Sequence, residues 1–86
     1  MDDINRGERA SQVLNNEVYK EAFTALRAEL YEGFCKTSFK QSDERDEIWR
    51  HQQAVDYIEG YLKEVMETGE IARATLAQRA KKVVGL

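Results

Sequence analysis

The stretch from Ile48 to Val65 reads IWRHQQAVDYIEGYLKEV, and it decides the fold class of this chain. Apolar residues and one histidine recur in it every three or four positions: Ile48, His51, Val55, Ile58, Leu62 and Val65. Residues three and four apart lie on one face of a helix, so this spacing predicts a helix whose one face packs against a partner. We place this helix over residues 43–68.

A second stretch upstream has the same rhythm, in Tyr19, Phe23, Leu26 and Leu30, and predicts a helix over residues 17–35. Asn16 is a good N-cap for it, because asparagine side chains accept backbone hydrogen bonds at helix starts. Residues 36–42 predict the turn between the two segments, with Ser42 as the N-cap of the longer helix. Together the two segments predict an antiparallel helical hairpin.

Shorter helices are expected at both ends of the hairpin. Residues 6–14 predict the first, with Gly7 as its weak point. Gly69 fits the residue that follows a helix end, so residues 70–84 predict a separate, basic terminal helix. The expected fold class is therefore all-α: a single domain of residues 1–86, built on an antiparallel hairpin with short N-terminal and C-terminal helices.

A chain of 86 residues has a small core, and its single cysteine and single histidine exclude an internal disulfide and the usual zinc ligand sets. We therefore expect the fold to be completed by oligomerisation or by a partner protein. Four carboxylates at residues 43–47 lie where acids stabilise a helix start and lack the central glycine of a calcium loop. No metal and no cofactor is predicted.

The long predicted helix carries more apolar residues than one seam needs. Trp49, Tyr57, Tyr61 and Met66 flank the seam and are the candidate interface residues, since aromatic side chains often anchor protein interfaces. The alternative is that Trp49 packs under the loop at Phe39 and the tyrosines lie along the rim. Both interpretations stay open at this point.

Charge is unevenly distributed along the chain. Residues 1–70 carry sixteen acidic and nine basic side chains, a net charge of −7, whereas residues 71–86 carry four basic side chains and no acid. The four are Arg73, Arg79, Lys81 and Lys82. They either complement the negative end of a helix dipole or form a docking tail for an acidic protein or nucleic acid.

His51 and Cys35 are the only residues with obvious special chemistry. His51 falls in the predicted seam, where it is expected to be a packed imidazole or a pH-sensitive group. Cys35 is expected to behave as a small apolar residue. Neither has a partner in a catalytic motif, so we expect no enzymatic activity.

No apolar run approaches the roughly 20 residues that cross a bilayer, and the start of the sequence lacks the pattern of a secretion signal. These features predict a protein of a reducing cytoplasm with no membrane partner.

Three stretches resemble a family of small, uncharacterised helical proteins that tailed bacteriophages encode among their head and packaging genes. They are Asn16–Phe23 (NEVYKEAF), the pair Ile48-Trp49, and Leu62–Gly69 (LKEVMETG), and the resemblance covers about residues 8–72. It implies a phage protein of the host cytoplasm and possibly the virion, with itself or another phage protein as partner. It implies no catalytic residues, and the loop at residues 36–42 lacks the proline of the family pattern.

The favoured function is a non-enzymatic virion-assembly or structural interaction protein that acts as an oligomeric helical module. One alternative is a nucleic-acid-binding regulator or small packaging subunit, which would use the basic tail. Another is a phage-encoded inhibitor of a host protein.

Overall fold

A computed structural model describes residues 2–83 and 85 of the chain. It contains the helices α1 (Asp2–Leu14), α2 (Glu17–Lys36) and α3 (Ser42–Val83), and the described residues form no strand. The all-α class is confirmed. The first helix begins four residues earlier than the sequence suggests, at Asp2.

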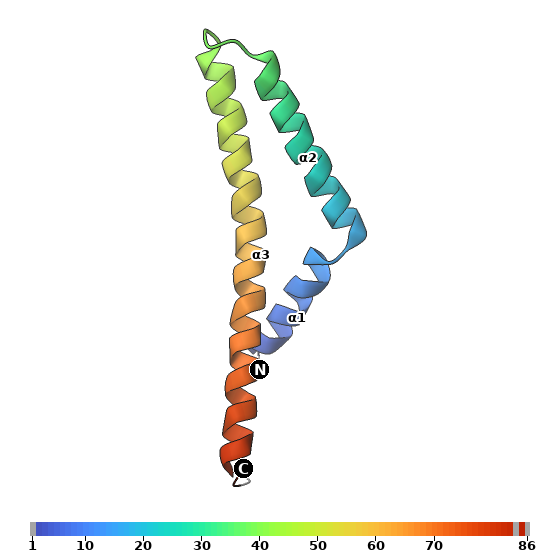
Figure 1. Cartoon of the computed structure of the whole chain (residues 1–86), viewed down its shortest axis with the longest axis vertical. Coiled ribbons are helices and arrows are strands. Elements are labelled where there is room, and N and C mark those ends of the chain that lie inside the picture. Colours follow the sequence, from blue (N-terminus) through green and yellow to red (C-terminus); the bar gives the residue numbers. More distant parts are fainter. Residues whose placement is uncertain (1, 84, 86) are drawn as a thin grey trace.

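The three helices lie in one elongated arrangement, which Figure 1 shows from the side. α1 and α2 follow one another along α3, and both run opposite to it. α1 starts against α3, and the chain then moves away from α3 to the start of α2. α2 approaches α3 again along its length and joins it through the loop of residues 37–41. α1 makes by far the more extensive contact with α3, so α2 and α3 do not form a closely packed hairpin along their lengths.

Local sequence explains where the helices begin and end. The Asn16 side chain accepts a hydrogen bond from the Tyr19 backbone N–H at 2.9 Å, which confirms the predicted cap of α2. At the other end of α2, the Thr37 N–H donates to the Phe34 carbonyl at 3.1 Å. Ser42 is the first residue of α3, and the Gln41 carbonyl before it accepts from the Arg45 N–H at 3.1 Å. The helix therefore starts one residue earlier than a Ser42 cap would require.

α3 continues through Gly69 without a break, so the predicted helix end there and the separate helix over residues 70–84 are wrong. Gly69 is buried where α1 crosses α3, directly opposite the buried Gly7. A Cβ atom on either glycine would lie 2.8 Å from the Cα of the other, closer than such atoms approach. Gly69 therefore permits a close helix crossing and does not end a helix.

The predicted seam of α3 is right at Ile48, Val55, Leu62 and Val65, which are buried or half-buried, and wrong at the two positions between them. Gln52 and Glu59 are half-buried there, whereas His51 is exposed and Ile58 is 49% exposed. The prediction assigned apolar residues to the inside. In the structure α2 diverges from α3 below the loop, and its Arg27 reaches Asp56 and Glu59 of α3. The expectation that His51 is packed in the seam is therefore wrong.

The folded protomer has almost no interior. Ala10 and Val55 are the only buried hydrophobic residues among those the structure describes. The radius of gyration is 19.4 Å, against roughly 12 Å for a compact domain of this length. The accessible surface is 7,023 Å², about 1,800 Å² more than the scaling for a monomeric protein of 10.0 kDa gives. One chain alone leaves much of its apolar surface in water.

Candidate interaction surface

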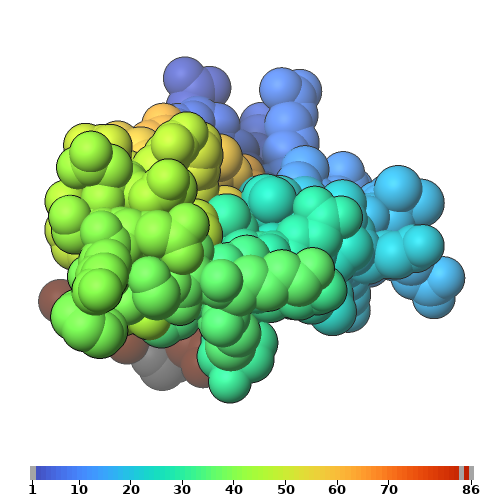
Figure 2. All heavy atoms as spheres, turned by 90° about the horizontal axis from the view of Figure 1, so that it is seen from above, coloured from blue at the N-terminus to red at the C-terminus, as the bar shows by residue number. Residues whose placement is uncertain are grey.

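An apolar hollow lies between α2 and α3 near the loop, and we call its five apolar lining residues the upper furrow: Leu30, Tyr31, Phe34, Ile48 and Trp49. Its volume is about 400 Å³, and Arg27 and Gln52 complete its lining. Seen from the loop end, the two helices stand side by side with α1 behind them (Figure 2). Leu30 and Ile48 are half-buried, whereas Tyr31 and Trp49 are 72% and 61% exposed. The furrow is therefore open to another molecule.

Arg45 fixes the loop end of this furrow. Its Nε donates to the Thr37 hydroxyl at 2.9 Å, and its second guanidinium nitrogen donates to the Thr37 carbonyl at 3.2 Å. The guanidinium carbon also lies 4.5 Å from the centre of the Phe34 ring, within the range of a cation–π contact. These contacts hold the end of α2 against the start of α3, although the loop contains neither glycine nor proline.

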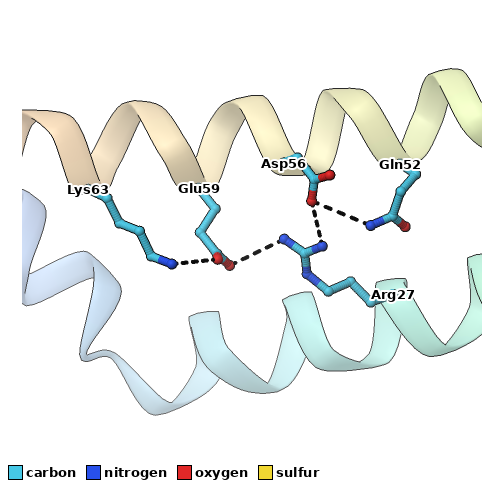
Figure 3. A network of polar contacts seen from close by, with 5 residues as sticks. All are labelled: Arg27, Gln52, Asp56, Glu59 and Lys63. Carbon is cyan, nitrogen blue, oxygen red and sulfur yellow. Dashed lines mark hydrogen bonds and ion pairs between the residues drawn. The ribbon is translucent and has the colours of Figure 1, made fainter.

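Below the furrow, Arg27 of α2 links the two helices (Figure 3). One guanidinium nitrogen lies 2.7 Å from an oxygen of Asp56, and another lies 3.4 Å from an oxygen of Glu59. Lys63 pairs with Glu59 at 3.1 Å, and Gln52 donates to Asp56 at 3.4 Å. The network lets α2 and α3 associate through charged groups where their apolar faces diverge.

The network shifts the pKa values of its members. The hydrogen bond from Lys63, with the nearby Arg27 guanidinium, lowers the pKa of Glu59 below its usual value, and partial burial opposes this. The hydrogen bond to Asp56 raises the pKa of Arg27. Both shifts favour the charged forms of Glu59 and Arg27, the two groups that join α3 to α2.

A second hollow, of about 490 Å³, lies below the network where the three helices meet. The rings of Tyr19 and Phe23 stack in its wall, with centroids 4.4 Å apart. The Tyr19 hydroxyl is buried without a hydrogen-bond partner, and burial raises the pKa of Tyr19. This unpaired group marks a site where the protomer is imperfectly packed.

The predicted interface residues do not form one surface. Trp49 belongs to the upper furrow, whereas Tyr57 and Tyr61 form a tilted pair 6.5 Å apart, with the Tyr61 hydroxyl 3.5 Å from an Arg6 nitrogen of α1. Trp49 and Tyr61 are twelve residues apart, which rotates them by about 120° around the axis of one helix. Met66 is half-buried between the helices. Trp49 and Phe39 are both strongly exposed, so Trp49 does not pack under the loop.

The basic residues lie on the last part of α3, which extends beyond α1 (Figure 1). Arg73 forms an ion pair with Glu8 of α1 and is therefore tied to the body. Residues 74–83 are all exposed, and we call them the free end. It carries Arg79, Lys81 and Lys82, with no ion pair to any carboxylate among the described residues.

The side chains that most often hold metal ions do not cluster in the described part of the chain. Within residues 2–83 and 85, no three side chains of the types His, Cys, Asp and Glu are placed to hold a metal ion. Cys35 is a free, exposed thiol, and His51 is exposed on α3. None of the helices described is both long enough and apolar enough to span a bilayer.

Comparison with known protein families, with curated proteins and with solved structures finds no match for this chain. The resemblance to small phage proteins therefore stays a prediction.

Two features of the structure were not predicted from the sequence: the charged network around Arg27 and the crossing of Gly7 with Gly69. Arg27 sits among the apolar positions of α2, and Asp56 and Glu59 lie three residues apart on α3, a spacing that a single cation can bridge. Gly7 and Gly69 have a second possible role, because glycine inside a helix permits the close approach of another backbone. Only knowledge of which helices touch distinguishes these uses.

Proposed function

We propose that this protein is a non-enzymatic helical assembly module that functions as a homo-oligomer. The observation that carries the proposal is the surplus of exposed surface on a chain whose described residues include only two buried hydrophobic ones. Covering about 1,800 Å² on each of two protomers would bury about 3,600 Å² in total, which lies in the range of obligate homodimers. A second copy of the chain supplies an apolar surface of the same kind, so no other protein is needed to cover the first.

The setting of this module rests on sequence resemblance. The stretches at residues 16–23 and 62–69 support a role in the assembly of a phage particle. A helical protein of this kind contributes by bridging other chains, and its exposed aromatic residues are suited to such contacts.

Solution mass tests the proposal, and Trp49 reports on the surface at the same time because it is the only tryptophan. We expect light scattering to give a discrete mass above the 10.0 kDa of one chain, persisting in high salt. Trp49 emission should be blue-shifted in the oligomer and shift to the red on dilution. A monomer at every concentration would overturn the proposal.

Tyr31→Ser and Val18→Ser form a matched pair for this test. Both residues are more than 70% exposed, so neither substitution removes core packing, and only Tyr31 lines the furrow. Tyr31→Ser should weaken association, and Val18→Ser should leave it unchanged. Equal effects would show that the furrow is not the contact surface.

Nucleic-acid binding is the second candidate, supported by the exposed cluster of Arg79, Lys81 and Lys82 on the free end. Binding through phosphate contacts releases counterions, so affinity for duplex DNA should then fall steeply with salt. The triple variant Arg79→Gln, Lys81→Gln and Lys82→Gln should lose most of that salt dependence. Weak binding that is unaffected by salt would remove this candidate.

A further inference from the structure

We infer that two copies pair about a two-fold axis with their α3 helices in opposite directions, so that each free end lies against the upper furrow of the other copy. This inference rests on the proposed function, since it names the arrangement of the homo-oligomer. It follows from three observations: the positions of the two exposed apolar surfaces, the exposure of the whole free end, and the distribution of charge.

The two surfaces lie at opposite ends of one helix. The furrow includes Ile48 and Trp49 near the start of α3, whereas the free end includes Leu76 and Val83, which are 50% and 86% exposed. A helix of 42 residues is about 63 Å long. Surfaces so far apart on a straight helix cannot cover one another within one chain, but two copies in opposite directions bring each beside its counterpart.

The free end also requires external support to remain helical. None of its ten residues is buried by the rest of the chain, and isolated helices of this length are marginal in water. Its aliphatic side chains, Leu76 and Val83, match the furrow, which is lined by apolar residues and leaves Tyr31 and Trp49 exposed. Seating the free end there supplies a third helix beside α2 and α3 and covers Tyr31, Phe34 and Trp49.

Charge selects the direction of pairing. The free end has three cations and no acid, whereas residues 1–70 carry a net charge of −7. Parallel copies would place two cationic ends side by side, where like charges repel. Opposite copies place each cationic end along an acidic body, near Asp43, Glu44, Asp46 and Glu47 at the start of α3.

A two-fold pairing is closed. The free end of the first copy meets the furrow of the second, and the reverse contact is identical, as an isologous interface requires. Both apolar surfaces of both copies are then used. No copy retains an open furrow that would recruit a third chain, so the predicted assembly is a dimer.

The exposed Cys35 provides the direct test, because it is the only cysteine and lies at the loop end. With a spin label on Cys35, pulsed electron paramagnetic resonance measures the distance between the two labels of a dimer. If residue 79 lies level with residue 46 of the other copy, the rise of an α-helix gives about 50 Å between labels. Parallel copies would instead place both labels at the same level along the helices, so that the 23 Å width of a protomer, and not the length of α3, sets their separation.

A charge exchange tests the same contact without a label. Arg79→Glu with Lys82→Glu should weaken the dimer at least tenfold, and Asp46→Lys with Glu47→Lys should do the same. In a mixed dimer of the two variants, the introduced glutamates face the introduced lysines at one contact and the wild-type charges face each other at the second. Both contacts then carry opposite charges, so mixing should recover most of the lost association. All four side chains are exposed, so none of these substitutions removes a buried contact, and circular dichroism of each variant checks that the helices remain.

The outcomes separate this inference from the proposed function. A monomeric mass overturns both. A dimer with a short label distance overturns the opposite orientation and leaves the assembly module standing. A dimer with the long distance but no recovery on mixing would overturn the contact between the free end and the start of α3. A mass larger than a dimer would overturn the closed pairing.

Discussion

Gly7 and Gly69 determine how closely α1 approaches α3. A Cβ on Gly7 would meet the Gly69 Cα at 2.8 Å and the Val65 carbonyl oxygen at 3.2 Å, and both are backbone atoms that cannot move aside alone. Gly7→Ala should therefore destabilise the protein by about 1–3 kcal/mol, through displacement of α1. Urea unfolding followed by circular dichroism measures the change.

Gly60 is the control for this prediction, because it lies in the same helix as Gly69 with nothing within 4 Å of its would-be Cβ. Gly60→Ala should raise the stability by up to about 1 kcal/mol, since alanine favours the helix. If both alanine variants were equally stable, the glycine crossing would not exist.

The Tyr19 hydroxyl is buried without a partner, so removing it should help the fold. Tyr19→Phe should stabilise the protein by about 1 kcal/mol at neutral pH. Burial raises the pKa of Tyr19 above its ordinary value of 10.0, so the wild type should lose stability as the pH rises above 10, and the phenylalanine variant should lose less. Urea midpoints at pH 7 and pH 10.5 check both parts, and a less stable variant would reveal an unseen partner of the hydroxyl.

Glu59 gives the network of Figure 3 its pH dependence. Its pKa is lowered from 4.5, so its contribution to stability is complete above about pH 4.5 and is lost as the pH falls through the lowered value. Glu59→Gln should flatten the fall of the melting temperature between pH 5 and pH 3. Glu67→Gln, an exposed carboxylate outside the network, should keep the wild-type slope.

At the scale of elements, α3 is supported along only part of its length. α2 and α1 cover successive parts of it, and residues 74–83 are covered by neither. Amide hydrogen exchange should therefore be fast over residues 74–83 in dilute protein and slow near Val55, where the side chain is buried. At high protein concentration the amides of the free end should exchange more slowly. An exchange rate that does not change with protein concentration would argue against docking of the free end.

At the scale of the molecule, an incomplete protomer makes stability depend on concentration. Within residues 2–83 and 85, only Ala10 and Val55 are buried hydrophobic residues, so most of the stabilising contacts are left to be made between chains. The melting temperature should rise by several degrees per tenfold increase in protein concentration. A constant melting temperature across a hundredfold range would mean that one chain is stable alone.

Local sequence patterns correctly predict that this chain is helical, where α2 begins, and where the turn lies. Those properties depend on local spacing and on capping at Asn16, which act within a few residues. The prediction at Gly69 was wrong, because glycine favours both a helix end and a close helix crossing. The burial predicted for His51 and Ile58 was also wrong, because apolar spacing does not reveal where the partner helix moves away. Contacts between distant residues, Gly7 with Gly69 and Arg27 with Asp56 and Glu59, were decided by the tertiary structure alone. The path of α2 away from α3 separates the furrow, the charged network and the free end, and no local pattern encodes that path.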